Sequence, residues 1–120
     1  MSTYQTEEIM AEGGVRWILS HEEREHLGEL LDVDASTFDN LKGNIMNRSR
    51  MACKKCGKLS GLDDIVHGAV ELGVHTKGLM IYTLVHGPTG GSPAHAVDCS
   101  RCSEQFEGVF LWFSPSNWSY

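Results

Sequence analysis

The segment RSRMACKKCGKLSG, residues 48–61, places two cysteines two residues apart among arginines and lysines. A second pair with the same spacing follows at Cys99 and Cys102. A tight Cys-x2-Cys turn presents two thiolates to one metal ion, and two such turns complete a tetrahedral shell of four sulfur atoms. The sequence therefore predicts one Zn²⁺ ion per chain, bound by Cys53, Cys56, Cys99 and Cys102.

The residues around the first pair suit such a site. Gly57 directly follows Cys56, where a turn of this kind favours a residue that tolerates a positive φ angle. The second loop departs from this pattern, because Ser103 stands where glycine is expected. Three lysines could offset the negative charge of four thiolates: Lys54, Lys55 and Lys58. Four sulfur ligands leave no open position for water, so we expect the zinc to be structural.

Together Cys53, Cys56, Gly57, Cys99 and Cys102 make the chain resemble the zinc-ribbon group in a broad sense. In that group two cysteine loops pin a small antiparallel sheet, and the resemblance covers residues 51–113. The 42 residues between the pairs exceed the gap of the compact pattern. Other interpretations stay open: an iron centre, although both loops lack proline; a redox pair, although Cys53 follows a predicted helix; or uncoordinated thiols or disulfides.

Size and composition favour one intracellular domain. A chain of 120 residues can bury one core, and no run of 18 apolar residues suggests a membrane span. The N-terminus lacks the basic and apolar regions of a secretory signal. We therefore expect a cytoplasmic protein without a membrane partner, in which cysteines remain reduced.

Charge is unevenly distributed along the chain, which has a net charge of −6. Residues 1–40 hold ten acids and two bases, whereas residues 41–62 hold six bases and no acid. The acidic total disfavours general nucleic-acid binding, but the local cluster predicts one contact with nucleic acid or another anion. The predicted contact residues are Lys42, Arg48, Arg50, Lys54, Lys55 and Lys58. Alternatively, the basic run docks on the protein's own acidic N-terminal third.

Periodicity predicts helices before the first cysteine pair. Residues 1–19 read as a loosely docked arm, followed by a single zinc-stabilised domain over 20–120. Ser20 and Glu23 have capping-box spacing, which predicts a helix over 21–31. A second helix is expected over 36–51, which completes a helical hairpin over 20–50.

Asparagines on the second predicted helix suggest one way to contact DNA. Asn40, Asn44 and Asn47 follow i, i+4, i+7 spacing, and Arg48 and Arg50 come next. Asparagine can pair with adenine edges, and arginine with guanine or phosphate. The pattern resembles the docking face of a helix-turn-helix protein. Alternatively, the asparagines form a polar face that is exposed to solvent.

After the first cysteine pair we expect a short helix that ends at Gly73 and a strand over 79–86. Further strands over 94–99 and 108–113 would flank the second pair, before an irregular tail over 114–120. The predicted fold class is α+β: an N-terminal helical hairpin, then a zinc-ribbon-like region over 51–113 with a short helix and a small antiparallel sheet.

These features favour a small, non-enzymatic interaction module with structural zinc, which contacts nucleic acid or a transcription-type complex through residues 42–58. One alternative is a protein-binding adaptor that uses the acidic helix or the aromatic tail with Trp118 and Tyr120. Another is a small enzyme or enzyme subunit that uses His86 and His95, which flank a glycine-rich loop. The segment HEEREH does not have metalloprotease spacing, because its histidines are five residues apart.

Overall fold

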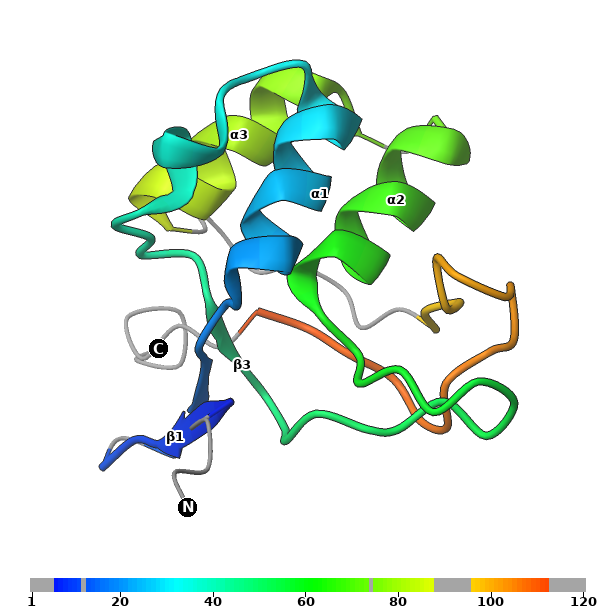
Figure 1. Ribbon diagram of the computed structural model, residues 1–120. Coiled ribbons are helices and arrows are strands. Elements are labelled where there is room, and N and C mark those ends of the chain that lie inside the picture. The colour runs from blue at the N-terminus through cyan, green and yellow to red at the C-terminus, as the bar shows by residue number, and fades with distance from the viewer. Residues whose placement is uncertain (1–5, 12, 74, 88–95, 113–120) are drawn as a thin grey trace.

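The computed structural model describes residues 6–11, 13–73, 75–87 and 96–112 (Figure 1). Helices gather on one side of the molecule, and a small sheet and the two cysteine loops lie below them in this view. The elements are β1 (Glu7–Ile9), β2 (Val15–Trp17), α1 (His21–Leu31), the 3₁₀ helix η1 (Ala35–Phe38), β3 (Ile45–Met46), α2 (Leu62–Glu71) and α3 (Lys77–His86). The α+β class is confirmed, but the sheet is N-terminal and does not follow a helical hairpin.

Helix α1 forms where the sequence predicts it. The Ser20 hydroxyl oxygen accepts the N–H of Glu23 at 3.2 Å, and the Glu23 carboxylate accepts the N–H of Ser20 at 3.3 Å. This capping box satisfies two N–H groups that the first turn leaves without helical partners. Leu27 and Leu31 face the core, where α1 packs against α2, α3 and η1.

The predicted N-terminal arm is wrong, because its described residues include two strands. Strand β1 pairs with β2 in antiparallel register, and β2 pairs with β3. Trp17 is fully buried, and its ring nitrogen donates to the carbonyl of Arg48 at 2.9 Å. Alternation along β2 puts Val15 and Trp17 into the core and leaves Arg16 exposed. The first strands therefore belong to the same packed unit as the helices.

The second predicted helix, over 36–51, is also wrong. Asp34 caps η1 by accepting the N–H of Ser36 at 2.9 Å, and η1 ends at Phe38. The N–H groups of Lys42 and Gly43 both donate to the carbonyl of Leu84 on α3. The chain then enters β3. Hydrogen bonds to distant parts of the chain thus replace the local bonds that an amphipathic helix would make.

The asparagines of that segment serve the fold rather than a recognition helix. Asn44 is buried, and its side-chain amide donates to the carbonyl of Trp17 at 2.8 Å. The side-chain oxygen of Asn47 accepts the N–H of Leu111 at 2.9 Å. No helix presents these side chains on one face, so the prediction of helix-turn-helix docking is wrong.

Gly43 lies directly against the last turns of α3. A Cβ atom at this position would overlap the carbonyl oxygen of Thr83, which is backbone and cannot swing aside. We expect Gly43→Ala to lower the free energy of unfolding by about 1–3 kcal/mol, because the segment must separate from α3. Gly68→Ala within α2 is the matched control, because its Cβ would meet open space. It should leave the free energy of unfolding unchanged or raise it by about 0.5–1 kcal/mol. Urea unfolding measures both, and equal effects would contradict the close approach.

The predicted strand over 79–86 is wrong, since these residues belong to helix α3. Thr76 caps this helix by accepting the N–H of Leu79 at 3.2 Å, and Gly87 ends it with a φ of 93°. Met80 and Leu84, four residues apart, are buried on one face. Because burial of this face stabilises a helix, the segment is helical although its β-branched residues favour a strand.

The predicted strands around the second cysteine pair are reduced to single bridges in the described residues. Asp98 pairs with Gln105, and Trp112 pairs with Met46. The α2 prediction is confirmed, with Gly73 at a φ of 69° just beyond the helix. One core joins all these parts; its largest fully buried apolar side chains are Trp17, Phe38, Leu27, Met46, Leu62, Leu84 and Val66.

Candidate metal centre

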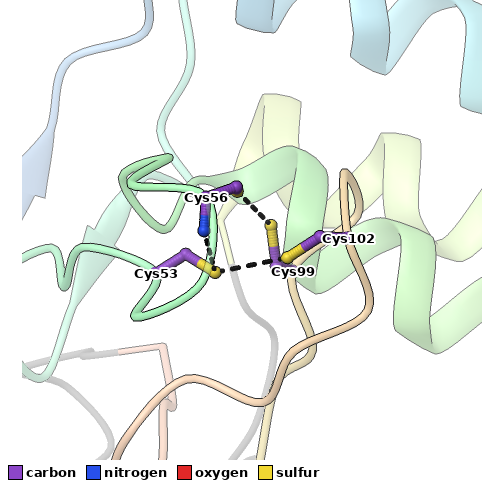
Figure 2. Close-up of side chains that lie close together, drawn as sticks. All are labelled: Cys53, Cys56, Cys99 and Cys102. Carbon is purple, nitrogen blue, oxygen red and sulfur yellow. Dashed lines mark hydrogen bonds between the residues drawn. The ribbon is translucent and has the colours of Figure 1, made fainter.

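The two cysteine pairs meet in space (Figure 2). The sulfur atoms of Cys53, Cys56, Cys99 and Cys102 all lie within 4.8 Å of one another. The Cys53 and Cys102 sulfurs are 3.4 Å apart, and those of Cys56 and Cys99 are 3.6 Å apart. All four cysteines are free, and each short distance joins one loop to the other. The fold therefore brings together two pairs of sulfur ligands, and cysteines of different pairs are 43 residues or more apart in the chain.

The two loops have the same backbone design at positions offset by 46 residues. In the first, the Cys53 N–H donates to the carbonyl of Lys58, and the Gly57 N–H donates to the carbonyl of Cys53. In the second, Cys99 donates to Glu104, and Ser103 donates to Cys99. A single antiparallel bridge closes each loop, Ala52 with Leu59 and Asp98 with Gln105. The matching geometry identifies both loops as cysteine knuckles.

A left-handed residue follows the second cysteine of each knuckle. Gly57 has a φ of 81° and Ser103 has a φ of 70°. Because a side chain at positive φ crowds the backbone, we expect Ser103→Gly to stabilise the protein by about 1 kcal/mol. Gly57→Ala should destabilise it by a similar amount, although its Cβ would meet no atom within 4 Å. Thermal unfolding of both variants tests this opposite pair of signs, and a shift of the same sign in both would refute it.

The four sulfur atoms lie so close together that negative charges on all of them would repel one another. The backbone N–H of Cys56, helped by that of Lys55, lowers the pKa of Cys53 to about 6. Burial raises the pKa of Cys99. At Cys102 the N–H of Glu104 acts to lower the pKa, but burial and the neighbouring sulfurs outweigh it and raise the pKa to about 12. All four can be thiolates together only beside a compensating cation, which suits the cluster to a metal ion.

Asp64 ties the knuckles to the first turn of α2. Its carboxylate is fully buried and accepts four hydrogen bonds. One oxygen accepts the Gly61 N–H and the Lys58 ammonium, both at 2.7 Å. The other accepts the N–H of Ser100 at 2.8 Å and its hydroxyl at 2.7 Å. Lys58 belongs to the first knuckle and Ser100 to the second, so one carboxylate fixes the position of both.

Asp63 forms a second buried acidic contact beside the first. One of its carboxylate oxygens accepts from Lys58 at 3.2 Å, and the other lies 2.8 Å from Nδ1 of His26 on α1. Burial lowers the pKa of Lys58, but the two carboxylates outweigh it and raise that pKa overall. Lys58 is thus paired with Asp63 and Asp64, so its charge is matched within the protein.

Arg50, one of the predicted contact residues, is buried. Its guanidinium donates to Glu23 at 3.0 Å, and to the backbone carbonyls of Thr6, Ile18 and Ser60. It also lies 5.2 Å from the centre of the Trp17 ring. These partners occupy the guanidinium inside the protein. At this residue the basic run docks on the acidic N-terminal third, which is the alternative that the sequence left open.

The other predicted contact residues have mixed surroundings. Lys54 forms an exposed ion pair with Glu107 at 3.5 Å. The Arg48 guanidinium lies 5.0 Å from the centre of the Phe110 ring. Lys42 and Lys55 are exposed. The structure therefore separates the predicted basic surface into one buried arginine, paired or stacked cations and two exposed lysines.

The remaining predicted residues have different outcomes. His86, at the end of α3, is exposed and lies against Tyr82, with ring centres 4.6 Å apart and ring planes tilted by 40°. His95, Trp118 and Tyr120 lie outside the described residues, so their predicted roles stay predictions. No helix in the ranges that the structure describes is long and apolar enough to cross a membrane.

The polar residues that support the knuckles are not among those predicted from the sequence. Asp63 and Asp64 begin α2 and can be read from the sequence as ordinary first-turn acids. Their partners are Lys58, Ser100 and His26, and two of these are more than 30 residues away. The acidic pair beside a cysteine loop was the available signal, but only the fold identifies what the carboxylates contact.

Fold and site together define a small α+β protein whose four clustered cysteines suit one metal ion. The chain belongs to the family described as "Domain of unknown function (DUF8243)", whose model matches residues 2–119. Neither a curated protein nor a solved structure matches the chain.

Proposed function

We propose that the four cysteines bind one Zn²⁺ ion that holds the two knuckles together, and that the protein is a non-enzymatic interaction module. The observation that carries this proposal is the approach of four free sulfurs within 4.8 Å on two matching loops. In a tetrahedral site with Zn–S bonds of about 2.3 Å, sulfurs lie about 3.8 Å apart. The Cys53–Cys102 and Cys56–Cys99 sulfur–sulfur distances, 3.4 and 3.6 Å, need only a small adjustment to accept the ion.

The surroundings of the sulfurs support a structural role for the metal. Cys53 and Cys99 are buried, and backbone N–H groups of both loops point at their sulfurs. A shell of four thiolates has no position for a substrate or a water molecule. The proposed zinc ion holds together two loops without regular structure. It thus gives this part of the protein the stability that a hydrophobic core provides elsewhere.

Native mass spectrometry of the purified protein tests the stoichiometry of this site. We expect one zinc ion per chain, and one Co²⁺ ion after substitution. Cobalt bound by four thiolates has the intense absorption of tetrahedral sulfur coordination, which reports both ligand type and geometry. A metal-free chain with reduced cysteines, or an iron ion in the protein as purified, would refute the proposal.

Contact with an anionic partner, such as nucleic acid, is a second and narrower proposal. It now rests on the exposed lysines Lys42, Lys54 and Lys55, because Arg50 and Lys58 are engaged within the protein. Lys55 has no hydrogen-bonding or ion-pair partner among the described residues. An exposed cation without a partner can neutralise a phosphate without losing an existing pair.

Salt dependence distinguishes this contact from other kinds of binding. We expect affinity for a short DNA or RNA duplex to fall as salt rises and to fall further in a Lys54→Glu/Lys55→Glu variant. Lys77→Glu is the control, since Lys77 lies on α3, across the molecule from the knuckles in Figure 1. An affinity that does not fall as salt rises would contradict a phosphate contact through the knuckle. So would an equal loss of affinity in the Lys54→Glu/Lys55→Glu and Lys77→Glu variants.

A further inference from the structure

A cleft of about 720 Å³ lies between the first half of α1 and the two knuckles. Residues from each of these parts line it, and α2 contributes Asp63. Its wall includes Glu22 and His26 on α1, one helical turn apart, and Gly57 and Ser100 on the knuckles. The cleft is a separate place from the four sulfurs, because none of the cysteines lines it.

His26 is held in one orientation by a buried carboxylate. Its Nδ1 lies 2.8 Å from Asp63, whose side chain is 3% exposed, while the His26 side chain is 35% exposed. A carboxylate only accepts hydrogen bonds, so Nδ1 carries the proton and the lone pair of the neutral ring is on Nε2. Nε2 has no partner among the described residues. A fixed imidazole with a free Nε2 therefore lies at the wall of the cleft.

A free carboxylate accompanies this imidazole. Glu22 and His26 are four residues apart, which places both side chains on the same face of α1. Glu22 forms no ion pair or hydrogen bond with any described residue. Its neighbour Glu23, in contrast, is occupied by the capping box and by Arg50. The wall thus offers one nitrogen and one oxygen ligand, neither of which the fold uses.

We propose that Glu22 and Nε2 of His26 bind a second divalent transition-metal ion of the zinc class in this cleft. Imidazole and carboxylate both bind such ions, and a metal-binding histidine usually donates its other ring N–H to a carboxylate, as His26 does to Asp63. Two protein ligands leave positions for water or a small ligand, in contrast to the closed sulfur shell. This site is independent of the proposed structural zinc.

Chain residues also provide an internal control for the proposal. His21 and Glu25 form a similar pair four residues apart on the same helix, but their side chains bond to each other at 2.8 Å. His21 is 74% exposed, and no buried carboxylate holds its other nitrogen in the described structure. If any histidine–glutamate pair on a helix bound the ion, this pair would bind it as well.

Titration of Zn²⁺ into protein that already holds one equivalent tests the second site. We expect calorimetry and native mass spectrometry to show one further ion, which His26→Ala removes and His21→Ala leaves in place. Glu22→Gln should weaken its binding about tenfold, and Asp63→Asn about 10–100-fold. In ¹⁵N spectra of the histidine rings, the Nε2 signal of His26 should move while Nδ1 remains protonated.

Several outcomes would overturn this site. One is that His21→Ala loses the second ion to the same extent as His26→Ala. Another is that His26→Ala keeps the second ion. The third is adventitious binding only, without a fixed stoichiometry. If His26→Ala does not fold, His26→Gln replaces it, because an amide N–H can still donate to Asp63. The first equivalent on the cysteines should survive the His21, Glu22 and His26 variants, so failure here is distinguishable from failure of the structural zinc.

Discussion

Replacing either Cys56 or Cys99 by serine is expected to abolish tight zinc binding and to unfold at least the C-terminal half of the protein. A structural zinc ion contributes roughly 10–16 kcal/mol of apparent binding free energy in small zinc domains. A whole domain is stable by only about 5–15 kcal/mol. Loss of the ion therefore removes as much free energy as the fold has. Chelation of the wild-type protein should have the same effect, which circular dichroism and near-ultraviolet spectra can follow.

Comparison of the two cysteines makes this prediction specific to a metal. Cys99 is 1% exposed, whereas Cys56 is exposed to solvent. If the sulfurs only packed in the core, Cys56→Ser would change stability by no more than about 0.5 kcal/mol, as exposed substitutions usually do. As metal ligands, both should cause a similar and large loss. A stable Cys56→Ser variant with an unfolded Cys99→Ser variant would reject the zinc site in favour of packing.

Asp64→Asn is expected to lower the free energy of unfolding by about 3–5 kcal/mol, as the removal of one partner from a buried ion pair does. The substitution keeps the size of the side chain but changes one oxygen into an NH₂ group. Since Gly61, Lys58 and Ser100 all donate to this carboxylate, the new donor faces another donor in either orientation. Zinc affinity should fall as well, because Asp64 positions both knuckles.

Asp98→Asn is the matched control, with the same chemical change at an exposed carboxylate next to Cys99. Its effect should lie within about 0.5 kcal/mol. Urea unfolding of the zinc-loaded proteins and competition with a coloured chelator give the two readouts. An Asp64→Asn variant as stable as Asp98→Asn would show that the buried carboxylate does not hold the knuckles.

Local signals were sufficient where the chain satisfies its own backbone. Ser20 and Glu23 cap α1 within four residues, so the sequence predicts this helix correctly. Gly73 ends the α2 region for a similarly local reason. The Thr76 cap of α3 is an equally local signal, but the β-branched residues after it favour a strand and compete with it. The wrong prediction of a strand over 79–86 therefore reflects two local signals that conflict.

Other features depended on contacts that no local pattern contains. Gly43 and Asn44 lie in a segment with helical periodicity, yet their bonds go to α3 and β2. Arg50 reads as a surface cation, but the carbonyls of distant loops and Glu23 bury it. Such partners are identified only when the chain has folded, so composition and periodicity could not distinguish a structural arginine from a binding arginine.

The sequence by itself determined the α+β class, helix α1 and the choice of four cysteines, because the spacing within each Cys-x2-Cys pair is a local property of one turn. Only the tertiary structure decided that the N-terminal residues form the sheet and that Asp63 and Asp64 support the knuckles. It also decided that His26, and not His86, has a buried carboxylate behind it. The physical reason is the same throughout: buried polar groups must find partners, and here those partners are far away in the chain.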